Sequence, residues 1–165
     1  MARSTGKKQL AVVPRVRAVE ARTGQEAIPY LLRQVAERLG RSLNEALKPF
    51  DQTPSVYRVL IALTRRNPAR ITELAELTLL ELSTLSRTVD RMQTDGLVKR
   101  ASGSDDARTV LVSLTPAGRD FLERILPAVS AQYEWAIHDV RGPDLEVMRA
   151  VLKAMLRNLR VSPIK

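Results

Sequence analysis

The segment from residue 82 to residue 92 combines short hydroxyl side chains with arginines at a helical spacing. Apolar residues recur there every three or four positions, at Leu82, Leu85, Val89 and Met92, which predicts a helix that turns this face to a core. The opposite face then carries Ser83, Thr84, Arg87, Asp90 and Arg91, flanked by Ser86 and Thr88. Hydroxyls bond phosphates, and an arginine fork binds a phosphate or a guanine edge through two hydrogen bonds. This face can therefore read a nucleic-acid groove, although the same spacing also suits a solvated helix surface.

A hairpin with a charged tip is predicted directly after this helix, which Gly96 ends as a C-terminal cap. Residues 97–100 and 109–114 have the apolar and β-branched composition of two short strands. The polar loop between them, residues 101–108, carries Asp105, Asp106 and Arg108.

Helices are predicted on both sides of this region. Apolar residues from Ile28 to Leu47 follow a helical period, so a long amphipathic helix is expected over about residues 28–48, stopped by Pro49. Thr53-Pro54 predicts a second helix, because threonine caps a helix and proline suits its first turn. Asn67-Pro68 ends that helix, and a short helix is expected to begin at Thr72.

Two further helices are expected in the C-terminal third. Thr115-Pro116 repeats the cap and proline signal, and Pro127 should kink or split the helix that follows. Gly142-Pro143 breaks the chain before a last amphipathic helix. The apolar stripes of the first and last long helices exceed what one small domain can cover. They therefore predict a two-fold dimer, the alternative being that they form the internal core of a monomer.

The composition excludes several kinds of chemistry. The 165 residues contain no cysteine, which excludes a disulfide scaffold, a cysteine-ligated zinc and a thiol switch. The single histidine, His138, excludes a multi-histidine metal site, and beside Asp139 it is expected to be a surface or capping residue rather than half of a catalytic pair. The chain has no long apolar run and no signal sequence, so we expect a cytoplasmic protein with neither metal nor cofactor.

The basic charge is concentrated at the N-terminus. Residues 1–23 carry six basic residues and one acidic residue, so they hold five of the nine net positive charges. This basic arm is either a solvated tail that aids solubility or an arm that touches nucleic acid.

Two stretches resemble the MarR family of bacterial transcriptional regulators: ITELAELTLLELSTLSRTVDRMQTDGLV (residues 71–98) and DDARTVLVSLTPAG (residues 105–118). The resemblance implies a mainly α fold, a winged helix-turn-helix with a short two-stranded wing between long N- and C-terminal helices. On this view residues 51–115 are the DNA-binding lobe. Residues 24–50 and 116–165 form a helical dimerisation region, and residues 1–23 are the basic arm.

The resemblance also implies which residues contact DNA. The expected set is Ser83, Thr84, Ser86, Arg87, Thr88, Arg91 and Arg108. Arg108 matches the family's wing-tip arginine, which enters a minor groove. The second wing arginine of the family is replaced by Ala107. We expect Asp105 or Asp106 to orient an arginine, since a carboxylate beside phosphate is otherwise unfavourable.

Members of this family commonly respond to small, often aromatic, anions bound between the dimer helices and the DNA-binding lobe. Phe50 and Tyr57 lie near the junction of the first two helices and are the candidates for such a ligand pocket, the alternative being plain core packing. The predicted function is a homodimeric, sequence-specific regulator of double-stranded DNA with a pseudo-palindromic operator. It is expected to be a repressor released by a small aromatic or anionic ligand.

Two other classes of function compete with this prediction. The first is a non-specific architectural DNA-binding protein that uses the basic arm. The second is an enzyme, which is not expected, because the sequence contains no nucleophile elbow, phosphate-binding loop or dinucleotide fingerprint.

Overall fold

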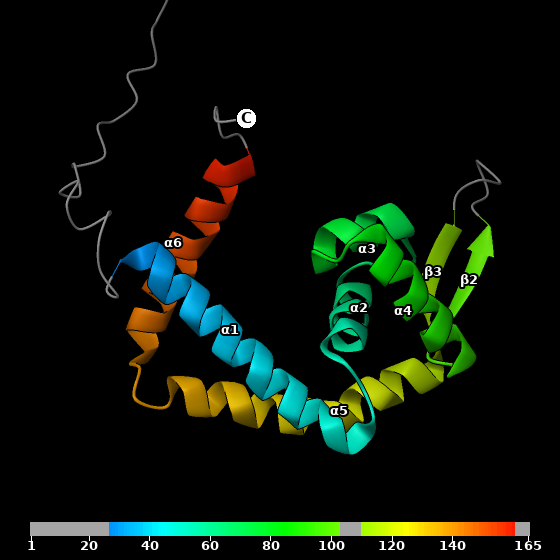
Figure 1. Ribbon diagram of the computed structural model, residues 1–165, viewed down its shortest axis with the longest axis horizontal. Coiled ribbons are helices and arrows are strands. Elements are labelled where there is room, and N and C mark those ends of the chain that lie inside the picture. The colour runs from blue at the N-terminus through cyan, green and yellow to red at the C-terminus, as the bar shows by residue number, and fades with distance from the viewer. Residues whose placement is uncertain (1–26, 103–109, 161–165) are drawn as a thin grey trace, which may run out of the picture. The chain divides into compact units, whose positions relative to one another are not determined.

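The computed structural model describes residues 27–102 and 110–160, which are mainly helical (Figure 1). The chain divides into two compact units after Arg41, within the first helix. The elements follow in the order α1 (Ile28–Leu47), the 3-10 turn η1 (Lys48–Phe50), α2 (Pro54–Arg65), β1 (Ala69–Arg70), α3 (Ile71–Thr78), α4 (Leu82–Thr94), β2 (Val98–Ser102), β3 (Val110–Leu114), α5 (Pro116–Ile137) and α6 (Gly142–Arg160).

Both predicted threonine caps are confirmed. The Thr53 hydroxyl accepts a hydrogen bond from the Val56 N–H at 3.5 Å, and the Thr115 hydroxyl accepts one from the Gly118 N–H at 3.0 Å. In each case the proline that follows occupies the first turn, where its missing N–H costs no hydrogen bond. The short helix α3 begins at Ile71, one residue before the expected Thr72, and the Glu73 carboxylate accepts the Arg70 N–H at 2.9 Å.

The core of the second unit lies among α2, α3, α4 and the sheet. Leu85, Val89 and Met92 of α4 are completely buried, as the helical period predicts. They pack with buried residues of α2 such as Leu60 and Leu63. The prediction that Leu82 shares this buried face is wrong: its side chain is 55% exposed, because the first turn of α4 extends past the core.

The predicted two-stranded wing is part of a three-stranded antiparallel sheet in the order β1-β3-β2. The predicted strands correspond to β2 and β3, which pair from Val98 with Leu114 to Ser102 with Val110. The prediction lacks β1, where Ala69 pairs with Val112 and Arg70 pairs with Leu111. A two-residue strand is too short to show an alternation of apolar and polar residues in the sequence. It can be recognised only from its pairing with β3.

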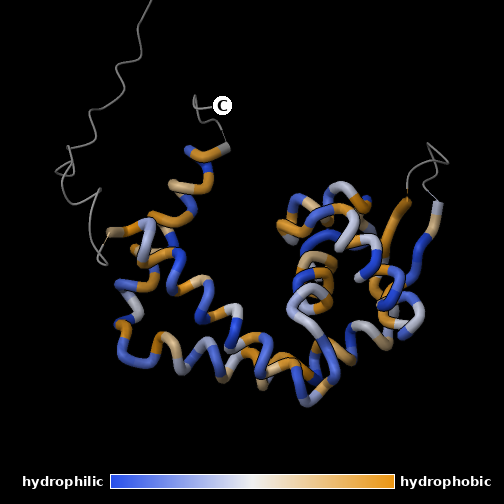
Figure 2. Tube along the Cα trace, viewed as in Figure 1, coloured by the Kyte–Doolittle hydropathy of each residue, from blue (hydrophilic) through white to orange (hydrophobic). Residues whose placement is uncertain are grey.

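The helix α5 continues through Pro127, so of the two expected outcomes, a kink or a split, the split does not occur. Its first half contributes Phe121, Leu122 and Ile125 to the core, whereas Tyr133 and Trp135 in its second half are exposed. Along α6, exposed apolar side chains recur at helical spacing: Val147, Met148, Val151, Leu156 and Leu159. In Figure 2 these apolar positions alternate with hydrophilic ones along the helix.

Where α4 ends and α5 begins, two short motifs lie against each other. Gly96 adopts a φ of 73°, a conformation that favours glycine. The Thr115 hydroxyl lies 2.7 Å from the Gly96 carbonyl oxygen and 3.1 Å from that of Leu97. Gly118 is buried beside the same Leu97 carbonyl, because α5 passes so close that a Cβ on Gly118 would lie 2.1 Å from this oxygen.

We expect Gly118→Ala to lower the free energy of unfolding by about 2 kcal/mol or more, since the clash is with backbone rather than with a movable side chain. Urea titration of the full chain measures it. Gly40→Ala is the matched control: a Cβ there meets nothing within 4 Å, and α1 should gain roughly 0.5–1 kcal/mol of helix propensity. Equal unfolding midpoints for the two variants would contradict the close approach of α5 to the Leu97 carbonyl.

Candidate nucleic-acid interface

The outer face of α4 presents most of the predicted DNA-contact residues together. Ser83, Ser86, Arg87 and Arg91 are exposed, while Thr84 and Thr88 are half-buried on the flank. The Thr88 hydroxyl donates to the Thr84 carbonyl at 2.8 Å, so it can only accept a further hydrogen bond. The face therefore has small residues in its N-terminal half and two arginines further along.

Arg87 is positioned by its own helix. Its Nε donates to the Ser83 carbonyl at 3.2 Å, and its Nη groups have no partner among the residues that the structure describes. The guanidinium thus keeps the pair of donors that a phosphate or a guanine edge requires.

Arg91 is held by two carboxylates instead. Its Nη2 lies 3.3 Å from the Asp51 carbonyl oxygen and 3.6 Å from the Asp51 carboxylate, and its Nε lies 3.7 Å from the Asp95 carboxylate. Asp51 caps η1 in the left-handed conformation, with a φ of 52°. Arg91 can reach DNA only if it gives up part of this arrangement.

The structure adds Arg100, which is not among the residues predicted from the sequence. Arg100 on β2 forms an ion pair through Nη1 with Asp90 on α4, and its Nη2 donates to the Ser86 carbonyl at 3.4 Å. Its side chain is 28% exposed, and its Nε is buried without a partner in the described part of the chain. Arg100 therefore fixes the wing strand to α4. Asp90 is an acid on a face that otherwise carries basic and hydroxyl side chains. Its presence there is the signal in the sequence that indicates a basic partner such as Arg100.

The wing tip lies outside the described residues. It contains Arg108, Asp105, Asp106 and Ala107, so the predicted minor-groove contact and the predicted aspartate–arginine pair remain predictions. The strands β2 and β3 that lead to the tip are paired up to Ser102 and Val110.

Of the two residues predicted for a ligand pocket, Tyr57 borders a cavity of the described part of the chain, and the pocket itself stays a prediction. Tyr57 lines a small cavity of about 130 Å³ with Arg58, Ile61, Ala62, Arg65 and Leu77. Burial raises the pKa of the Tyr57 phenol above its ordinary value. Phe50 and Tyr57 are both half-buried and pack against the core.

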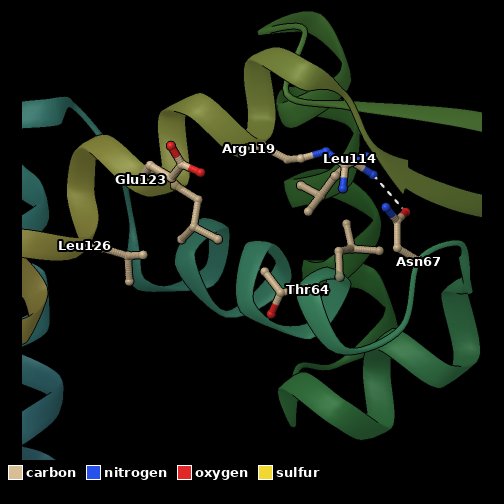
Figure 3. A pocket seen from close by; sticks show the side chains of 8 residues that line it. Thr64, Asn67, Leu114, Arg119, Glu123 and Leu126 are labelled. Carbon is tan, nitrogen blue, oxygen red and sulfur yellow. Dashed lines mark hydrogen bonds between the residues drawn. The ribbon is translucent and has the colours of Figure 1, made fainter.

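A larger cavity of about 350 Å³ lies between α2, the end of β3 and the first half of α5 (Figure 3). It is lined by Leu63, Thr64, Asn67, Leu114, Arg119, Leu122, Glu123 and Leu126. No pattern along the sequence indicates it, because its walls come from three separate elements.

The fold has a helical core, an exposed helix that carries hydroxyl and arginine side chains, and a strand pair fixed to that helix. Together these features define a winged helix-turn-helix DNA-binding protein. Comparison with known proteins gives the family. The family model described as "MarR family" matches residues 50–109. The multiple antibiotic resistance protein MarR of Escherichia coli is 37% identical over 136 residues, which span 79% of this chain and 93% of that protein. The chain belongs to the MarR family of transcriptional regulators.

Solved structures agree with this assignment. A MarR-family regulator from Silicibacter pomeroyi superposes with a TM-score of 0.76 at 31% identity, over 86% of this chain and 96% of that one. A mutant of Escherichia coli MarR in complex with operator DNA gives a TM-score of 0.70 at 28% identity, over 80% and 96%. BpsR of Bordetella bronchiseptica, whose DNA binding is regulated by 6-hydroxynicotinic acid, shares the fold at 21% identity, with a TM-score of 0.70 over 78% and 97%. No helix among the described residues is long and apolar enough to cross a membrane.

We expect Asp90 and Arg100 to be energetically coupled, because their ion pair joins two elements and the Arg100 side chain is largely shielded from water. A double-mutant cycle with Asp90→Ala and Arg100→Ala should give a coupling free energy of about 1 kcal/mol in urea unfolding. The control cycle is Arg141 with Asp144, an exposed pair 2.7 Å apart within one turn, which should couple by only about 0.2–0.5 kcal/mol. Coupling at Asp90 and Arg100 no stronger than in this control would show that the ion pair does not hold the wing.

Proposed function

We propose that this chain is a homodimeric repressor that binds a pseudo-palindromic operator in double-stranded DNA and is released by a small aromatic or anionic ligand. The observation that carries the proposal is the exposed face of α4, with Arg87 open to a partner and the wing strand fixed beside it by Arg100. The relative from Escherichia coli that was solved with operator DNA supports the same use of this fold.

The residues of the site take distinct roles in this proposal. Arg87 reads a guanine edge or binds a phosphate, and Ser83 and Thr84 allow the N-terminal turns of α4 to enter the major groove. Ser86 donates to a flanking phosphate, and Thr88 can do so only when its hydroxyl leaves the Thr84 carbonyl. Arg91, which is paired with Asp51 and Asp95, contributes less than Arg87, and Arg108 enters the minor groove from the wing tip.

A dimer explains the exposed apolar residues of α1 and α6. Ile28, Leu31 and Val35 of α1 are exposed, as are Val147 and Val151 of α6. Several large exposed apolar side chains along one helix indicate an interaction site. A two-fold partner would cover it and would set two α4 helices about 34 Å apart, one turn of the DNA helix.

The ligand part of the proposal is supported by BpsR, whose DNA binding is regulated by an aromatic acid. A ligand that binds more tightly to the arrangement with misaligned α4 helices would shift the protein away from DNA.

Genomic fragments bound by the purified chain at physiological salt should share an inverted repeat with half-sites about one helical turn apart. Broad recovery without a shared motif would favour the architectural alternative.

On a DNA site selected in this way, Arg87→Ala should cost about 1–3 kcal/mol of binding free energy, measured by fluorescence anisotropy. Arg149→Ala on α6 removes an equal charge away from this face and should leave the affinity within about two-fold of wild type. Equal losses for the two variants would contradict the role of α4.

Sedimentation of the wild-type chain at micromolar concentration should give a dimer. Val151→Asp should shift it toward monomer, because an unpaired carboxylate in an apolar interface is costly. Asn158→Asp on the same helix is the control for the added charge and should stay dimeric. A wild-type monomer would refute the dimer, and a dimeric Val151→Asp would place the interface away from this face of α6.

A further inference from the structure

The first residue of α4, Leu82, presents an apolar side chain to solvent. Within this helix, which lies wholly among the described residues, Leu85, Val89 and Met92 are completely buried, whereas Leu82 is 55% exposed. Single exposed leucines are common on protein surfaces, so exposure alone indicates no function. What matters is the place of this leucine within the candidate DNA-binding face.

Leu82 lies on the border between the buried and the exposed face of α4. Residues three and four positions apart are neighbours on a helix surface, so Leu82 borders the buried Leu85 and the exposed Ser86. Ser83, the next residue, is also exposed and has a side chain too short to cover a leucine. Because side chains on a helix tilt toward its N-terminus, Leu82 is directed toward the start of α4, the end that a major groove receives.

The contact between α4 and the wing strand lies on the same flank of the helix. The Arg100 guanidinium on β2 donates from Nη2 to the Ser86 carbonyl at 3.4 Å and forms an ion pair with Asp90. Ser86 is about one turn beyond Leu82, so the leucine extends this flank toward the start of the helix. The exposed leucine is therefore continuous with the face of hydroxyls and arginines and belongs to the same interface.

A leucine at this place requires an apolar partner in DNA. It can neither donate nor accept a hydrogen bond, and placing it against a phosphate would remove water from a charge without replacing that water. Among the base edges in the major groove, the apolar group is the C5-methyl of thymine. Apolar contact with this methyl is one of the ways in which side chains recognise an A·T pair.

We propose that Leu82 contacts the C5-methyl group of a thymine in each operator half-site and thereby selects thymine at that position. Arg87 and the hydroxyls of α4 supply the polar contacts, while Leu82 supplies an apolar contact at the start of the helix. The inference rests on the proposed function, since it needs α4 in a major groove. It names a residue outside the set predicted to contact DNA.

The test replaces each thymine of a selected operator by deoxyuridine, which lacks only the C5-methyl group, and measures the affinity by fluorescence anisotropy. At one thymine position, wild type should lose about four-fold in affinity for each half-site replaced, since about one methyl group of apolar surface then stays without its partner. Equal affinity for the thymine operator and for every deoxyuridine operator would overturn the proposal.

Leu82→Ala assigns the methyl contact to its residue. On the thymine operator this variant should bind about four-fold more weakly per half-site than wild type, and on the deoxyuridine operator the two proteins should bind equally. Alanine favours a helix and the removed side chain is more than half exposed, so the urea unfolding midpoint should change little. An equal loss of affinity on both operators would show that Leu82 does not act through the methyl group.

Two further variants separate this contact from general apolar character. Leu82→Met keeps a long apolar side chain, so it should retain the preference for thymine over deoxyuridine. Leu79→Ala removes a leucine that is 85% exposed in the turn before α4, and it should keep the wild-type preference. Loss of the preference in Leu79→Ala but not in Leu82→Ala would place the methyl contact in this turn and overturn the assignment to Leu82.

The outcome of the DNA selection separates this inference from the proposed function. If wild type recovers no shared DNA sequence, the proposed function is refuted together with the operator contact that rests on it. If wild type recovers an inverted repeat whose affinity depends on no thymine methyl, only the role of Leu82 is overturned. Selected half-sites that contain no thymine would overturn it in the same way.

Discussion

The close packing of residues 96 and 97 against residues 115–118 is the constraint on which the DNA-binding lobe depends. The hydroxyl of Thr115 caps α5 and at the same time lies within hydrogen-bond distance of the carbonyls that follow α4. Gly118 allows α5 to lie against Leu97 with no side chain between them. The end of α4, the end of β3 and the start of α5 thus meet at one point. The direction of α5 is therefore tied to the positions of both α4 and β3.

The same lobe shows why an acidic residue belongs on a surface built for an anion. Asp90 would repel phosphate if it were unpaired, but with Arg100 it forms a neutral pair that holds β2 to α4. Asp51 and Asp95 have a related effect on Arg91, which they keep beside the loop before α2. Arg91 and Arg100 thus have acidic neighbours, whereas Arg87 has none among the described residues.

The sequence was sufficient for the features that depend on local rules. Helical periodicity located α4 and its buried residues Leu85, Val89 and Met92, and the threonine–proline pairs located the starts of α2 and α5. What it could not provide depends on tertiary structure. Leu82 fits the apolar period but lies beyond the core, and β1 exists only because β3 pairs with it. Arg100 and the Arg119 cavity join elements that are distant in the chain, so no spacing along the sequence revealed them.

The two ends of β3 lie at the cavity beside Asn67 and at the wing. At Val110 the strand leads out of the wing tip, and at Leu114 it is held by Asn67 beside the cavity. The strand β3 is paired with β2 from Val110 to Leu114, and Arg100 on β2 is joined to Asp90 on α4. Asn67 and α4 are therefore connected through a continuous set of hydrogen bonds and one ion pair, and none of these contacts belongs to the apolar core.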